Sequence, residues 1–96
     1  MKVRYRRRAQ LDIENIHEYI ERQNPRAAAE IVARIRYAAE RLGTWPYMGH
    51  AGRAKGTHEW VVVGSPYVIA YEVDPAADEV VIIAVFHGAR RRDEEW

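Results

Sequence analysis

The chain has 96 residues, of which 48% are hydrophobic, so it is long enough to form one small domain with a buried core. It contains no cysteine, which excludes a disulfide framework and a thiolate metal site and is compatible with a reducing cytoplasm. The formal net charge is only +1, but the charges are segregated: residues 1–8 carry five basic side chains, and residues 90–92 are all arginine. The near-neutral total is therefore compatible with a basic face.

No targeting or membrane segment is evident. The basic N-terminus is not followed by the apolar stretch of a secretory signal, and no run approaches the roughly 18 apolar residues of a membrane span. Repeats, linkers and low-complexity tracts are also absent from the sequence. We therefore expect residues 1–96 to form one cytoplasmic domain that does not bind a membrane.

The first half of the chain predicts one strand and two helices. Residues 2–6, "KVRYR", alternate apolar and charged side chains, as in a half-buried strand. Residues 9–22 have isoleucines at helical spacing, which predicts a first helix. Asn24 is a good N-cap and Pro25 occupies the favoured first position of a second helix, which is expected to run to about Leu42 and to end at Gly43. The short connection predicts an antiparallel helix hairpin.

The second half predicts a loop and three strands. Pro46 and three glycines mark residues 44–56 as a loop. Residues 58–63, 67–73 and 79–87 are rich in β-branched and aromatic residues, and the turn sequences "GSP" and "DPAAD" separate them. The order predicts an α+β domain in which the helix hairpin packs on one face of a mostly antiparallel sheet. The last strand is apolar on both faces and should lie centrally.

Strong catalytic motifs are missing from the sequence. It has no Walker-type phosphate loop, no dinucleotide fingerprint and no zinc-protease helix, and its four histidines lack metal-ligand spacing, so we expect neither a cofactor nor a metal. His87 is the most suggestive titratable residue, because it follows an apolar strand and could act as a general acid or base. The favoured interpretation is nevertheless a hydrogen-bonded histidine at a strand end. With Arg90 it could also bind a phosphate or the acidic residues of a partner.

A second group of candidates lies around residues 53–60. Arg53 and Lys55 are in the glycine-rich loop, and Glu59 opens the next strand. If strands 58–63 and 79–87 approach each other, these groups could converge with His87 and Arg90, and Glu59 and His87 could serve as base and acid for RNA cleavage. A polar loop without chemistry is the favoured alternative. The aromatic residues of this region could stack on bases, although anchoring roles are more common; they are Trp45, Tyr47 and Trp60.

Two stretches resemble a known family. "NPRAA" at the helix turn and "GTHEWVVVGSPYVIAYEVDPAADEVVIIAVFHGARR" at residues 56–91 resemble the RelE/ParE toxin superfamily of bacterial type II toxin–antitoxin modules, often labelled plasmid-stabilisation proteins. The resemblance spans nearly the whole chain. It implies a β-α-α-β-β-β fold, a cytoplasmic location, a cognate antitoxin and a toxin–antitoxin hetero-oligomer.

The resemblance also implies one of two activities. RelE-like members cut messenger RNA on the ribosome, and their third strand usually reads like "YRLVY", with an arginine that helps to hold the scissile phosphate. This chain reads "YVIAY", and Val68 cannot stabilise a phosphorane charge. The sequence is therefore closer to the ParE branch, whose members poison DNA gyrase. The alternative is a ribosome-dependent endoribonuclease with Glu59, His87 and Arg90 as catalytic residues.

The basic residues are interpreted as a surface for binding partner proteins. On the gyrase hypothesis this surface contributes to binding of the antitoxin, of gyrase, or of both. Its members are drawn from the loop and from the end of the last strand: Arg53, Lys55, His87, Arg90, Arg91 and Arg92.

Overall fold

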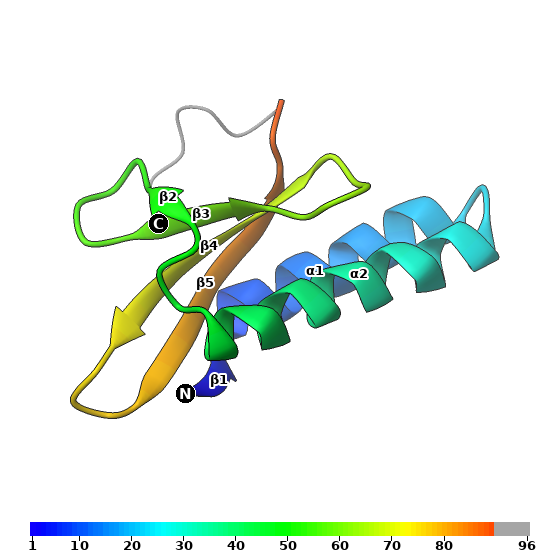
Figure 1. Cartoon of the computed structure of the whole chain (residues 1–96). Helices are drawn as coiled ribbons and strands as arrows, with labels where there is room; N and C mark the ends of the chain where they lie inside the picture. The colour runs from blue at the N-terminus through cyan, green and yellow to red at the C-terminus, as the bar shows by residue number, and fades with distance from the viewer. Residues whose placement is uncertain (90–96) are drawn as a thin grey trace.

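The architecture is a helix hairpin packed on one face of a five-stranded sheet. The computed structural model describes residues 1–89. In chain order its elements are β1 (Lys2–Tyr5), α1 (Arg7–Glu21), α2 (Pro25–Thr44), β2 (His50–Ala51), β3 (His58–Val61), β4 (Tyr67–Asp74) and β5 (Glu79–His87). Figure 1 shows the two helices side by side against the sheet, with the turn between them projecting beyond it. The predicted α+β class and helix hairpin are confirmed.

The sheet has the order β1-β5-β4-β3-β2. β1 is parallel to β5, whereas the other neighbours are antiparallel, so the sheet is mixed and mostly antiparallel. β5 lies inside the sheet between β1 and β4, which confirms the position predicted from its apolar run. Seven of its nine residues are buried, because helices cover one face and strands flank both of its edges.

Local sequence explains where the elements begin and turn. The Asn24 side chain accepts a hydrogen bond of 3.1 Å from the Ala27 N–H, so it caps α2 as predicted, and Pro25 takes the first helical position. In the β3–β4 turn, Gly64 adopts a positive φ of 76°, a conformation that glycine tolerates without strain. The β4–β5 turn is closed by Asp74, whose carboxylate accepts from the Ala77 N–H.

Several predicted boundaries are corrected. α1 begins at Arg7 rather than residue 9, and α2 continues to Thr44 instead of ending near Leu42. β3 ends at Val61, because the turn that leads into β4 already begins at Val62. The predicted loop 44–56 contains the two-residue strand β2, which pairs with His58 and Glu59.

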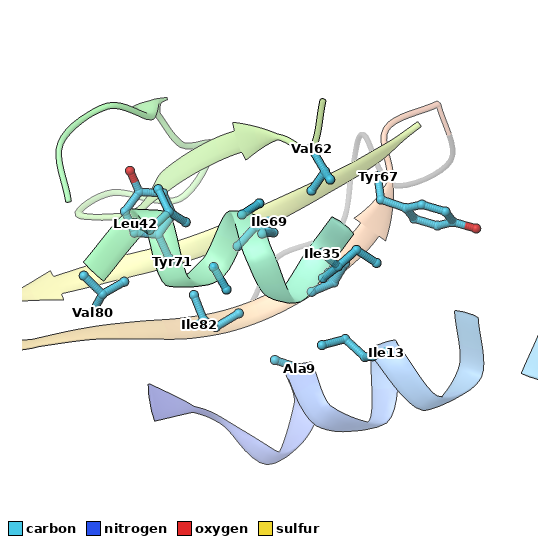
Figure 2. Packing of buried hydrophobic residues seen from close by; sticks show 13 residues of the cluster. Ala9, Ile13, Ile35, Leu42, Val62, Tyr67, Ile69, Tyr71, Val80 and Ile82 are labelled. Atoms are coloured by element: carbon cyan, nitrogen blue, oxygen red, sulfur yellow. The ribbon is translucent and has the colours of Figure 1, made fainter. Parts of the chain in front are cut away.

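The main core lies between the sheet and the hairpin. Figure 2 shows side chains of both helices directed toward the inner face of the sheet, meaning the face that the helices cover: Ala9 and Ile13 of α1, and Ile35 and Leu42 of α2. A smaller buried cluster occupies the opposite, outer face. Within residues 1–89, no helix is long and apolar enough to cross a membrane.

Candidate functional site

Glu59 lies on the outer face of β3. Its side chain is 9% exposed, and its Oε2 accepts a 3.2 Å hydrogen bond from the Arg53 N–H. The loop that carries Arg53 and Lys55 is a tight turn, in which the N–H of Gly52 donates to the Thr57 carbonyl. The carboxylate of Glu59 thus holds the base of a loop that presents two exposed cationic residues.

His87 lies on the inner face at the end of β5. Its ring makes an edge contact with Tyr67 at 5.6 Å, and its Nδ1 accepts a 3.2 Å hydrogen bond from the Ala89 N–H. That bond requires an unprotonated Nδ1 and leaves Nε2 as the proton-carrying nitrogen of the neutral ring. The favoured interpretation of His87 as a hydrogen-bonded strand-end histidine agrees with this geometry.

A β-bulge places His87 on the inner face. Ala70 pairs with Ala84 while Tyr71 pairs with Ile82, so Ile83 is an extra residue in β5. One extra residue inverts the alternation of every side chain that follows it. Without the bulge His87 would share the outer face with Glu59.

The structure therefore does not bring the two acid–base candidates together. β4 separates β3 from β5, and Glu59 and His87 project from opposite faces of the sheet. The condition for their convergence, a close approach of strands 58–63 and 79–87, is not met. Arg90, Arg91 and Arg92 lie outside the described residues, so their predicted roles stay predictions.

The centre of the outer face is apolar. Val68 is 8% exposed and packs in one cluster with Ala70, Ile83, Ala84 and Phe86. It lies between Val61 of β3 and Phe86 of β5 in the register of the sheet. Among residues 1–89, no group of three or more potential metal ligands is gathered.

Tyr71 anchors the segment that leads into β2. Its hydroxyl donates to the Pro46 carbonyl at 2.9 Å and accepts from the Gly49 N–H at 3.0 Å. Burial raises the pKa of Tyr71 above its usual value, against a smaller lowering by the Gly49 hydrogen bond. The ring of His58 stacks on Tyr71 at 5.2 Å. This residue was not singled out in the sequence, although it holds the loop in place.

A groove between α2 and β3 was also missed. It has a volume of about 450 Å³, and we call it the α2–β3 groove; it is lined by Arg34, Tyr37, Ala38, Arg41, Met48, Trp60, Val62 and Val63. Of the three aromatic candidates only Trp60 lines it, whereas Trp45 and Tyr47 are 60% and 62% exposed. The sequence contains a pattern that could have indicated the groove: Arg34, Tyr37 and Arg41 follow one face of α2 at intervals of three and four residues.

Comparison with known proteins defines the class. The fold is that of toxins from type II toxin–antitoxin modules: the chain superposes on the chromosomal ParDE toxin–antitoxin system of P. aeruginosa with a TM-score of 0.81 at 18% identity, covering 91% of this chain and 95% of that one. It also matches the toxin–antitoxin complex RelBE2 of Mycobacterium tuberculosis, with a TM-score of 0.61 at 25% identity over 90% of this chain and 95% of that one.

Sequence similarity identifies the family. The family described as the ParE toxin of the type II toxin–antitoxin system parDE matches residues 3–92. The Y4kP protein of Sinorhizobium fredii is 38% identical over 90% of this chain and 86% of its own length, and Toxin RelE2 of Caulobacter vibrioides is 38% identical over 86% and 90%. The chain belongs to the ParE toxin family, within the RelE/ParE superfamily, which confirms the resemblance found in its sequence.

Proposed function

We propose that this toxin inhibits bacterial growth by poisoning DNA gyrase in the cytoplasm, and that a cognate antitoxin neutralises it in a hetero-oligomer. The observation that carries the proposal is Val68. It lies buried in the apolar centre of the outer face, at the position where the RNA-cutting branch is expected to have an arginine. An aliphatic side chain cannot stabilise the charge of a phosphoryl transition state. The match to the ParE family and to complexes with antitoxins supports the same proposal.

The basic residues would then bind protein. Arg53 and Lys55 project from the turn that Glu59 holds, so the loop can present charge at a fixed place on the β3 side of the sheet. Together with His87, Arg90, Arg91 and Arg92, they are the proposed contacts to the antitoxin or to gyrase. Arginine suits this role because its planar group binds carboxylates through two hydrogen bonds.

The test is a cleavage assay with purified toxin, gyrase, supercoiled plasmid and ATP. We expect linear DNA to accumulate and the antitoxin to suppress it. A single replacement of Arg90, Arg91 or Arg92 by alanine should reduce the effect, whereas Arg26→Ala, at the start of α2, is a matched loss of one surface arginine and should not. Growth arrest by a toxin that leaves gyrase untouched would refute the proposal.

A second function is favoured by one observation, the 38% identity to Toxin RelE2. On this alternative the chain is a ribosome-dependent endoribonuclease in which Glu59, His87 and Arg90 take part in catalysis. Because Glu59 and His87 lie on opposite faces, they could not act on one phosphate in the described arrangement. If His87→Ala and Arg90→Ala both fold and remain fully toxic, this alternative is lost.

A further inference from the structure

A small pocket lies between α1 and the end of the sheet, apart from the α2–β3 groove. It has a volume of about 290 Å³, and we call it the α1 pocket. Helix α1 contributes Asp12, Asn15 and Tyr19, which share one helix face because they are three, four and seven residues apart. The sheet contributes Tyr67 at the start of β4 and His87 at the end of β5. Five side chains with polar groups thus surround one small hollow.

The carboxylate of Asp12 is fixed in the wall of the α1 pocket. Its side chain is 11% exposed, and its Oδ2 accepts from the Val85 N–H at 2.9 Å. The Nε of Arg8 also approaches Oδ2, at 3.6 Å. No donor within residues 1–89 bonds to Oδ1. Because a largely buried acceptor is costly to leave without a hydrogen bond, this oxygen favours a ligand that brings an N–H group.

The rest of the lining suits a flat cation. The side chain of Tyr67 is buried, and Figure 2 shows its ring directed away from the other labelled side chains of the core. Tyr19 adds a second aromatic ring, and cations are attracted to the faces of such rings. His87 is uncharged while its Nδ1 accepts from the Ala89 N–H. Within residues 1–89, no lysine or arginine lines the pocket, so its described lining carries a single negative charge.

We propose that the α1 pocket binds a guanidinium group, which donates to Oδ1 of Asp12 and to the side-chain carbonyl of Asn15 and lies against the tyrosine rings. The volume is just below the roughly 300 Å³ at which sites for whole small molecules begin, so the pocket fits one side chain. An ammonium group would match the charge, but a guanidinium is also planar and stacks on aromatic rings. The inference goes beyond the proposed function and holds whichever target the toxin has.

Two sources of this group are available. One is the chain itself, because Arg90 follows His87 by three residues, which span at most about 10 Å when extended. The other is an arginine of a partner protein. In the first case the pocket would fix the place of the basic residues that the proposed function assigns to partner binding. In the second it would anchor the partner directly.

Titration with a free guanidinium compound tests the site. The probe is N-acetyl-L-argininamide, added to full-length toxin and followed by NMR at the rings of Tyr19 and Tyr67 and at the Val85 amide. The same titration is made with a variant in which Arg90, Arg91 and Arg92 are alanine. N-acetyl-L-citrullinamide is the control compound, because its urea group has a similar shape without the charge. We expect the alanine variant to bind the arginine compound at least about tenfold more tightly than the control compound.

The two proteins distinguish the sources. Tighter binding of the probe by the alanine variant than by the unaltered toxin would show that the chain's own arginines occupy the pocket. Equal binding by both proteins would show that the pocket is open to an arginine from a partner. If neither protein binds the probe, or if the citrulline compound binds as tightly, the inference is overturned. Glutamine at the three positions is the milder replacement if the alanine variant does not fold.

Changes within the pocket check that the probe binds there, in whichever protein binds it. Asp12→Asn keeps an acceptor for the Val85 N–H but removes the charge, and it should weaken binding by at least about tenfold. Tyr19→Ala removes a ring and should also weaken binding. Tyr37→Ala is its matched control, an exposed tyrosine of α2 outside the α1 pocket, and should leave the affinity unchanged. Full affinity after both Asp12→Asn and Tyr19→Ala would place the probe elsewhere and refute the inference. This readout is independent of the gyrase assay, so the inference and the proposed function can fail separately.

Discussion

The two sides of the sheet are completed in different ways. On one side the edge strand β1 is short, and β5 extends beyond it. The N–H of Val85, which lies beyond the part of β5 that pairs with β1, is taken up by the carboxylate of Asp12 in α1 at 2.9 Å. On the other side β2 is also short and pairs only with His58 and Glu59, so β3 extends beyond it to Val61.

The two sides of the sheet also differ in charge. The β1 side carries Lys2, Arg4 and Arg6, and charged residues on an edge discourage the addition of another strand. Tyr5 packs beneath the guanidinium of Arg36, whose carbon lies 5.5 Å from the ring centre. On the β3 side, Val61 at the end of β3 and Val63 in the turn that follows are exposed instead. The β1 side is thus held by side chains of the fold, whereas the β3 side presents apolar side chains to solvent, and the following predictions test that difference.

The largest effect is expected where α2 closes on β1. A Cβ atom at Gly43 would lie 2.7 Å from the Met1 carbonyl oxygen and 2.9 Å from Val3 Cγ2, and the Met1 ammonium donates to the Gly43 carbonyl at 3.0 Å. Gly43→Leu should therefore push β1 from the helix and lower the free energy of unfolding by about 3 kcal/mol, measured by urea denaturation. Leucine is a better helix former than glycine, and this difference alone would raise the stability. A free energy of unfolding that is unchanged or raised would therefore show that β1 shifts to accommodate the larger side chain.

The next effect concerns Asp12. Asp12→Ala leaves the Val85 N–H without its acceptor and should cost about 2 kcal/mol, because an unsatisfied buried donor carries its full desolvation penalty. Asp12→Asn keeps one carbonyl oxygen and should cost less than half as much, although it loses the 3.6 Å ion pair with Arg8. Equal losses for both variants would assign the stabilisation to the charge rather than to completion of the β5 edge.

These particulars show what the sequence could and could not specify. Asn24 and Pro25 predicted the start of α2, and the apolar run of residues 79–87 predicted a central strand, because caps and burial patterns are local. β2 was missed because two residues have no periodicity, and their pairing depends on a loop that Tyr71 holds from a distant strand. The side of the sheet on which His87 lies depends on a bulge at Ile83, and the sequence pattern does not predict that bulge.

Tyr71, which holds the segment that leads into β2, gives a prediction that depends on pH. Tyr71→Phe removes both hydrogen bonds to the loop and should lower the free energy of unfolding by about 1 kcal/mol at pH 7. The raised pKa means that the phenol ionises in the unfolded chain before it does so in the folded one. The native protein should therefore lose stability as the pH rises above about 10, the ordinary value for tyrosine.

The phenylalanine variant lacks that ionisation, so the gap in stability between the two proteins should narrow between pH 9 and pH 11, a window set around the ordinary tyrosine value of about 10. Urea denaturation at several pH values measures it. Tyr5, whose pKa burial also raises, is present in both proteins and cancels in the difference. A gap that stays constant across this range would mean that Tyr71 is not protected from ionisation by the fold.

The smallest effect on stability is expected at Val63, in the turn that follows β3. Val63 is 75% exposed, so Val63→Lys should change the free energy of unfolding by no more than about 0.5 kcal/mol, measured by urea denaturation. A loss well above that value would place Val63 among the residues that maintain the fold and would erase the difference between the two sides of the sheet.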